Sequence, residues 1–177
     1  LAHNILPDGT QLPAPLVRAD CAGEAAGACF FDWLLNRNPA SLRHFWNLTS
    51  FTLDKMRVRE GRLHGMMRWS TTGWGVCYQD EVARALLGQL LYMKFSVNRA
   101  RMEDVAECLD FLVRTTGTDG LRVSCTHALT LTDARLRELR STPSGLVSAH
   151  RNAYYLADLL LAYQLRAEPR YLDTAIR

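Results

Sequence analysis

Two adjacent carboxylates, Asp80 and Glu81, stand at the start of a long apolar segment, Gln79–Phe95. In the first turn of a helix, free backbone N–H groups and the helix dipole stabilise negative charge. Asp80 is therefore suited to act as a general base, a nucleophile or an acceptor of a substrate hydroxyl, and plain helix capping is the structural alternative. We interpret Glu81 as a surface residue of the first turn. Arg84 follows Asp80 by four residues, where it either pairs with Asp80 or binds an anionic ligand.

Polar residues also open two other apolar segments. Asp20 and Glu24 stand at the start of the first segment, with Asp20 as the expected N-cap, and His150 and Asn152 open the last one. Each of them is an ordinary helix-start residue by itself. They would converge on one site if all the helices began at the same end of the molecule. Asp119 lies in a glycine-flanked sequence and is either a turn residue or a second carboxylate.

Trp69 and Trp74 lie together in a segment rich in Gly, Ser and Thr. Flat aromatic rings can stack on the C–H faces of sugar rings, and the structural alternative is that both tryptophans cover the core. The neighbouring glycines favour a shaped loop over a packed strand.

Composition narrows the function classes. The 177 residues carry a formal charge of +3, with 48% hydrophobic and 22% charged residues, as in an ordinary globular domain. No apolar run reaches the length of a membrane span, and the arginines are scattered among acids, so we expect neither a membrane nor a nucleic-acid partner. There is no glycine-rich nucleotide loop and no metal-ligand spacing, so we expect no cofactor and no metal. The five cysteines form no CxxC pair, which fits a reducing, cytoplasmic compartment.

One local group of cations departs from this scatter and points to an anionic ligand, such as a uronate. It comprises Arg57, Arg59, Arg62, His64 and Arg68.

The elements that must position these residues are predicted to be helical hairpins. Helices are expected at Asp20–Asn36, Gln79–Phe95 and Ala149–Arg166, each apolar around most of its circumference and therefore buried on several sides. A fourth, Ala100–Thr115, has a single apolar stripe and so one solvent side. Each buried helix is followed by a short turn and a second helix, a unit that recurs about every 60–70 residues and indicates a repeat architecture.

The connections between these hairpins are long. Thr52–Tyr78 and Thr116–Ser148 separate the units, with one short helix expected at Asp133–Arg140. Loops of this length in a compact domain are usually functional. Both lead into the start of a buried helix, so we expect the functional site at that end.

Alternating buried and half-buried helices with this loop pattern resemble the six-hairpin glycosidase superfamily, whose members form an (α/α)6 toroid. The resemblance is carried by WGVCYQDEVARALL at 74–87 and by NAYYLADLLLAY at 152–163, which are similar to inner helices of bacterial members. It implies an all-α fold of repeated helical hairpins, a partial (α/α) toroid with long loops at one end. It further implies an active site among the loops at the starts of the inner helices.

The resemblance implies a carbohydrate-active protein, most simply a glycoside hydrolase that uses two carboxylates. A polysaccharide lyase, a sugar epimerase and a non-catalytic helical-repeat module are the alternatives. The catalytic candidates are Asp80, Asp20 and Asp119. The candidates for binding an oligosaccharide or polysaccharide are Trp69, Trp74, Tyr78, Gln79, Arg84, His150 and Asn152.

The hairpin count also bears on chain length. Residues 1–177 supply two hairpins and the start of a third, whereas a complete toroid needs six. We therefore expect a single helical-hairpin domain that is a fragment of a larger toroid. Its exposed helical flank would be covered by the rest of a longer chain or by a homo-oligomer.

Overall fold

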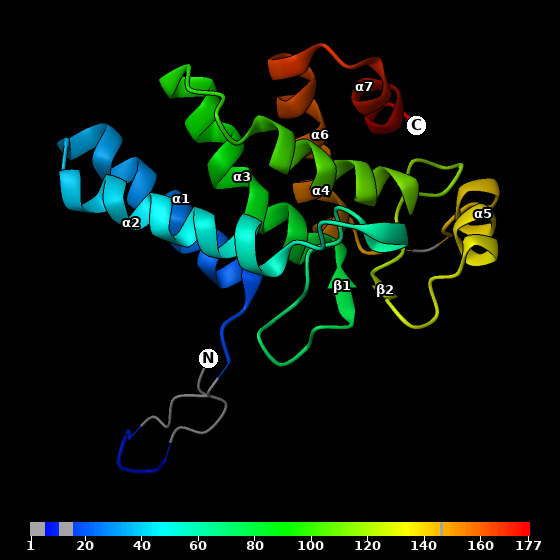
Figure 1. Ribbon diagram of the computed structural model, residues 1–177, viewed down its shortest axis with the longest axis horizontal. Helices are drawn as coiled ribbons and strands as arrows, with labels where there is room; N and C mark the ends of the chain where they lie inside the picture. The colour runs from blue at the N-terminus through cyan, green and yellow to red at the C-terminus, as the bar shows by residue number, and fades with distance from the viewer. Residues whose placement is uncertain (1–5, 11–15, 146) are drawn as a thin grey trace.

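The computed structural model describes residues 6–10, 16–145 and 147–177, and these form a helical molecule with one small sheet (Figure 1). The α-helices are α1 (Ala19–Asn36), α2 (Pro39–Ser50), α3 (Gln79–Ser96), α4 (Met102–Arg114), α5 (Asp133–Ser141), α6 (Ala149–Arg166) and α7 (Pro169–Ala175). The remaining elements are a π-helix η1 (Phe51–Met56), a 3-10 turn η2 (Gly61–Leu63) and the strands β1 (Val76–Tyr78) and β2 (Cys125–His127). Each helix predicted from sequence is present, within two residues at either end.

Three hairpins, α1–α2, α3–α4 and α6–α7, give the fold its repeat. Each first helix ends on a residue in the left-handed conformation: Arg37 (φ 55°), Val97 (φ 56°) and Ala167 (φ 55°). A left-handed residue after a helix reverses the chain direction and satisfies the last carbonyl groups. Pro39 and Pro169 then start the second helices, as predicted from their fixed φ.

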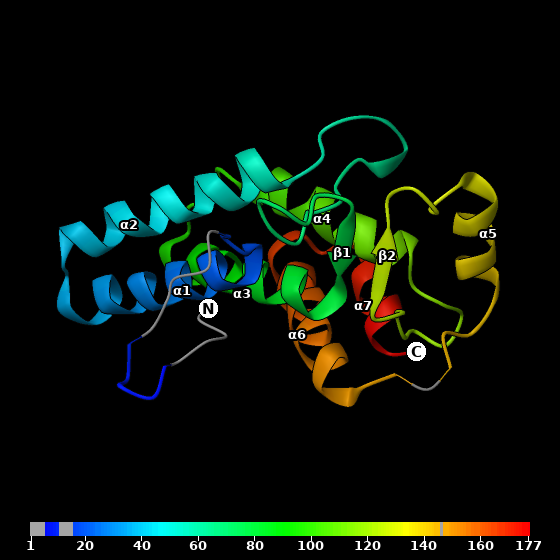
Figure 2. The ribbon, with the colours of Figure 1, turned by 90° about the horizontal axis from the view of Figure 1, so that it is seen from below.

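The first helices of the hairpins form an inner layer, and the second helices pack outside them. In this inner layer α3 lies between α1 and α6, while α2 packs on α1, α4 on α3, and α7 on α6. Figure 2 shows α1, α3 and α6 side by side, with α2 and α4 above them in that view. The predicted stripe of α4 is its buried face, formed by Met102, Val105, Leu109 and Leu112.

Glycine sets the distance between α1 and α3. A Cβ atom built on Gly23 would lie 2.3 Å from the Cα atom of Ala85, and one on Gly88 would lie 2.7 Å from the Cα atom of Gly27. These distances are impossible for real side chains, so the two helices touch through backbone at these points. The close approach brings the first turns of both helices together.

The long connections contain more order than the sequence predicted. β1 and β2 come from different connections and pair antiparallel, with Val76 opposite His127 and Tyr78 opposite Cys125. Because β1 runs directly into α3, the small sheet fixes the loops at the end where α3 begins, which is the lower end in Figure 1. No helix in the described part of the chain is both long and apolar enough to cross a bilayer.

Candidate functional site

Four carboxylates and two arginines meet where α1 and α3 begin. We call Asp20, Glu24, Asp80 and Glu81 the carboxylate cluster. Arg18 Nε donates to Asp20 Oδ1 at 3.0 Å, and Arg18 Nη2 donates to Glu81 Oε1 at 2.7 Å. From the other side, Arg84 Nη2 lies 3.3 Å from Asp20 Oδ2 and 3.4 Å from Asp80 Oδ2. Its Nη1 lies 3.3 Å from Glu24 Oε1. Two guanidinium groups thus hold four carboxylates.

This arrangement revises the expected role of Asp20 at the helix start. The residue before α1 is Arg18, whose side chain makes no capping hydrogen bond, so Asp20 is not the N-cap. Its buried carboxylate instead lies between Arg18 and Arg84. Asp20 therefore positions both arginines that hold the carboxylate cluster.

Glu81 is the group in the cluster whose chemistry the sequence did not reveal. Its side chain is only 14% exposed, and its Oε2 atom is buried without a hydrogen-bond partner among the described residues. Burial is the largest cause that raises the pKa of Glu81, to about 7, and the neighbouring carboxylates of Asp20 and Asp80 add to it. A carboxyl group with this pKa can donate a proton at neutral pH.

Aromatic residues form one side of the site. The ring of Trp69 lies 5.7 Å from that of Tyr78, edge to face, and the guanidinium carbon of Arg18 lies 5.8 Å from its centroid. The Trp69 carbonyl accepts a hydrogen bond from the N–H of Ala19 at 3.0 Å, which ties the loop to α1. Its indole N–H is buried and has no partner among the residues described. Trp69 and Tyr78 thus adjoin the cluster through Arg18.

Trp74 lies elsewhere in the same loop. It is 52% exposed, its ring stacks under Arg68 with the guanidinium carbon 4.2 Å from the centroid, and its N–H bonds the carbonyl of Thr71. No described contact joins Trp74 to the carboxylate cluster.

The start of α6 supplies the other side of the site. Gln79 Nε2 donates to Asn152 Oδ1 at 2.7 Å and so links α3 to α6. The exposed ring of His150 lies edge-on to Tyr154 at 5.8 Å. Tyr154 in turn lies 5.8 Å from the guanidinium carbon of Arg84, which places this aromatic pair beside the cluster.

Asp119 stays apart from these residues and holds a turn. Its carboxylate accepts hydrogen bonds from the backbone N–H groups of Leu121 and Gly145, both at 3.2 Å. Although partial burial acts in the opposite direction, backbone hydrogen bonds lower the pKa of Asp119. No described contact links Asp119 to the cluster. Its hydrogen bonds to backbone N–H groups fit the role of a turn residue, one of the two roles considered from the sequence.

A shallow groove of about 190 Å³ lies between α1, α3 and α6, and Glu24 is the one member of the carboxylate cluster in its lining. Its lining includes Glu24, Arg84 and Tyr154, together with Gly23 and Gly88. The glycines that allow the close helix contact also remove side-chain bulk from this groove. A ligand in it would lie against both charged and aromatic groups.

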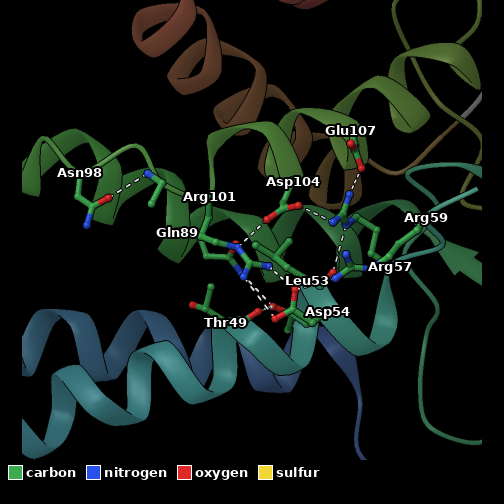
Figure 3. Close-up of polar contacts among 12 residues, drawn as sticks. Thr49, Leu53, Asp54, Arg57, Arg59, Gln89, Asn98, Arg101, Asp104 and Glu107 are labelled. Atoms are coloured by element: carbon green, nitrogen blue, oxygen red, sulfur yellow. Dashed lines mark hydrogen bonds and ion pairs between the residues drawn. The ribbon is translucent and has the colours of Figure 1, made fainter.

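Two members of the cation group predicted in the first long connection, Arg57 and Arg59, pair with different acids (Figure 3). Arg57 is buried and pairs with Asp104 and Glu107 of α4, while Arg59 bonds Asp54 at 2.8 Å. Arg57 thereby anchors the end of η1 to α4. Its charge is already balanced by acids of the chain, which removes it from anion recognition.

No three His, Cys, Asp or Glu side chains within the described ranges are arranged to hold a metal ion. The acids of the carboxylate cluster are paired with arginines instead.

Comparisons with known proteins place this geometry in context. No family model matches the chain, and no curated protein matches its sequence. Among solved structures, it is similar to an inactive variant of the α-1,6-mannanase GH76A of Salegentibacter sp. HEL1_6 in complex with α-1,6-mannotriose. That similarity has a TM-score of 0.69 at 15% identity and covers 90% of this chain and 45% of the mannanase.

Two other solved structures are similar. A D-mannose isomerase has a TM-score of 0.66 at 13% identity, covering 96% of this chain and 42% of its own. Cellobiose 2-epimerase from Spirochaeta thermophila has a TM-score of 0.68 at 17% identity, covering 94% of this chain and 43% of its own.

The chain thus spans less than half the length of these solved structures. At such low identity, the likeness shows the fold and not the activity. The architecture predicted from sequence is confirmed: the chain has an all-α fold of repeated helical hairpins, the partial (α/α) toroid that it shares with these solved structures.

Proposed function

We propose that this chain belongs to a carbohydrate-active enzyme that hydrolyses a glycosidic bond at the carboxylate cluster. The observation that carries the proposal is the pair Asp80 and Glu81 at the start of α3, in which burial raises the pKa of Glu81 to about 7. Glycoside hydrolysis needs one carboxyl group that gives a proton and one carboxylate that acts on the sugar.

The residues divide these roles by their surroundings. Glu81 donates its proton to the glycosidic oxygen, so that the leaving sugar departs as a neutral alcohol. Asp80, whose one ion pair within the described ranges is at 3.4 Å, attacks the anomeric carbon or takes a proton from the water that does so. Asp20 positions Arg18 and Arg84. The mannanase supports the parallel, because its inactive variant carries Asp→Asn substitutions at two adjacent positions.

The aromatic residues would bind the sugar. Trp69 and Tyr78 offer aromatic rings on one side, and Tyr154 with His150 offers rings on the other. Trp74, by contrast, would reach a sugar only outside the cluster.

The experiment is an assay of the full chain against a panel of α- and β-linked oligosaccharides, with detection of new reducing ends. Asp80→Asn should lower the rate at least about 100-fold, because it removes the group that acts at the anomeric carbon. Asp119→Asn is the matched control and should keep the wild-type rate. Cleavage that survives Asp80→Asn contradicts the proposal.

Epimerisation or isomerisation of a sugar is the second candidate, favoured by the likeness to the cellobiose epimerase and the mannose isomerase. The same incubations decide between them when products are analysed by NMR. A change in configuration without new reducing ends would support this second function, and sugar binding without any product would support a non-catalytic module.

A further inference from the structure

A second, positively charged pocket adjoins the proposed catalytic cluster. It has a volume of about 360 Å³ and lies where α3 and α6 begin. The lining includes Gln79, Arg122, Ser124, Ser148 and Arg151, and no acid is among the lining residues. Since Gln79 directly precedes Asp80 in the first turn of α3, the pocket and the carboxylate cluster are neighbours around one helix start.

Arg122 places an unbalanced charge at this pocket. The residue is 0% exposed, and its guanidinium donates to Thr115 Oγ1 at 2.7 Å, Thr126 Oγ1 at 3.0 Å and the Val123 carbonyl at 3.1 Å. All three acceptors are neutral, and no described carboxylate forms an ion pair with it. Buried charges in proteins are normally paired, so Arg122 leaves the pocket with positive potential.

Arg151 adds to that potential at an unusual position. It lies in the first turn of α6, which has no acid and no side-chain capping bond. A cation there opposes the helix dipole, whose positive end is at the same point. Arg151 also forms no ion pair within the described part of the chain. The two arginines and the start of α6 therefore all contribute positive potential at the pocket, and no acid among the lining residues balances it.

Gln79 provides a hydrogen-bond acceptor for a second group of the ligand. Its side chain is 0% exposed and fixed by the bond from Nε2 to Asn152, yet its Oε1 atom has no donor among the described residues. A buried acceptor without a partner is unfavourable, and a ligand hydroxyl would satisfy it. The pocket therefore fits a ligand that carries both an anionic group and a hydroxyl group.

We propose that this pocket binds the anionic substituent of an acidic sugar, a carboxylate or a phosphate, with a ring hydroxyl donating to Gln79. The link to bond cleavage rests on the proposed function, since the pocket then holds the sugar next to the cleaved bond. This reassigns anion recognition from the Arg57–Arg68 region to residues that border the site.

The test is an NMR titration of the full chain with glucuronate, glucose 6-phosphate and glucose. We expect one or both anionic sugars to bind at least about 10-fold more tightly than glucose, and the stronger of the two identifies the substituent. Arg151→Gln should remove most of this preference, and Arg137→Gln, an exposed arginine of α5 outside the pocket, should leave it unchanged. Equal affinity for glucose and both anions, or a preference that survives Arg151→Gln, overturns the proposal.

The binding test stands apart from catalysis. Binding of an anionic sugar in a chain that cleaves no glycan supports the pocket and contradicts the proposed hydrolase. Cleavage of neutral glycans with no anion preference supports the hydrolase and contradicts the pocket.

Discussion

Glu81 and Asp80 are neighbours in sequence but have different partners in the fold. Arg18 holds one oxygen of Glu81, whereas Arg84 reaches Asp80 from the opposite side. The buried second oxygen of Glu81 has no described donor, and the nearby acids disfavour its ionisation. Burial and these like charges raise the pKa of Glu81, so that Glu81 can hold a proton at neutral pH and act as the acid.

Substitution of Glu81 should change how stability depends on pH. Because the pKa of Glu81 is raised to about 7 in the folded chain, folded protein holds a proton that the unfolded chain releases near pH 4.5. Wild-type stability therefore falls as pH rises from about 4.5 to 7. In Glu81→Gln this loss is absent, so the difference in Tm between variant and wild type should be more positive at pH 8 than at pH 5. A difference that is the same at both pH values contradicts the raised pKa.

Asp158 gives a second test of a buried carboxyl group. It lies within α6 with 0% exposure, both its oxygens lack described partners, and burial raises its pKa well above the usual value. The folded state is then stabilised by protonation, and stability is lost as pH rises above the unfolded pKa of about 4. Asp158→Asn should stabilise the chain by about 1–3 kcal/mol at pH 7 and by much less at pH 4, as measured by urea unfolding. Destabilisation at pH 7 would show that Asp158 has a partner outside the described residues.

The sequence indicated part of this site because helix starts at one end must converge. Asp20, Asp80 and Arg84 meet as that argument expected. The properties of Glu81 could not be predicted, since they depend on Arg18 and Asp20, about 60 residues away in sequence. The roles of Gln79 and Arg122 could not be predicted either, because a buried polar atom without a described partner is recognised only when its neighbours in the fold are known.

At the scale of elements, the contact of α1 with α3 creates the site. Both helices carry catalytic candidates in their first turns, and these meet only because Gly23, Gly27 and Gly88 let the backbones touch. Side chains at the contact would separate the helices and pull the carboxylates away from their shared arginines.

Gly23→Ala should therefore affect both stability and the site. The added methyl group would meet the backbone of Ala85, which cannot move aside cheaply, so we expect a loss of about 1–3 kcal/mol in unfolding free energy. Gly75→Ala is the matched control, because a Cβ there has nothing within 4 Å and the backbone is ordinary. Equal stability of the two variants by thermal and urea unfolding would show that α1 and α3 are farther apart.

The elements differ in how well the sequence predicts them. Helices were predictable from apolar periodicity and from Pro39 and Pro169, which mark second helices locally. The pairing of β1 with β2 joins segments about 50 residues apart, and three-residue strands carry too little pattern to be recognised. Arg57, the residue directly after the π-helix η1, pairs with acids of α4, and no local signal in the sequence encodes this contact.

At the scale of the molecule, the inner layer has two open edges. Phe31 and Leu35 of α1 and Leu156 and Leu160 of α6 are exposed apolar residues on the two edge helices. The chain spans less than half of the similar solved structures, whose lengths leave room for further hairpins. We propose that further hairpins, from a longer chain or from a second copy, cover these edges.

Analytical ultracentrifugation tests this proposal directly. The full 177-residue chain should associate as its concentration rises, because exposed apolar faces favour burial. The double variant Phe31→Ser, Leu156→Ser should shift the association to at least about 10-fold higher concentration, since it removes apolar area from both edges. A wild-type chain that stays monomeric at high concentration contradicts coverage by a second copy.

Proton donation by Glu81 to the glycosidic oxygen is tested most directly by the pH profile of kcat/KM on a cleaved oligosaccharide. The wild-type rate should fall as pH rises above about 7, where Glu81 loses its proton. In Glu81→Gln the rate on the oligosaccharide should drop, the fall above pH 7 should vanish, and an aryl glycoside whose leaving group needs no proton should still be cleaved. If Glu81→Gln keeps the wild-type rate and profile on the oligosaccharide, Glu81 is not the acid.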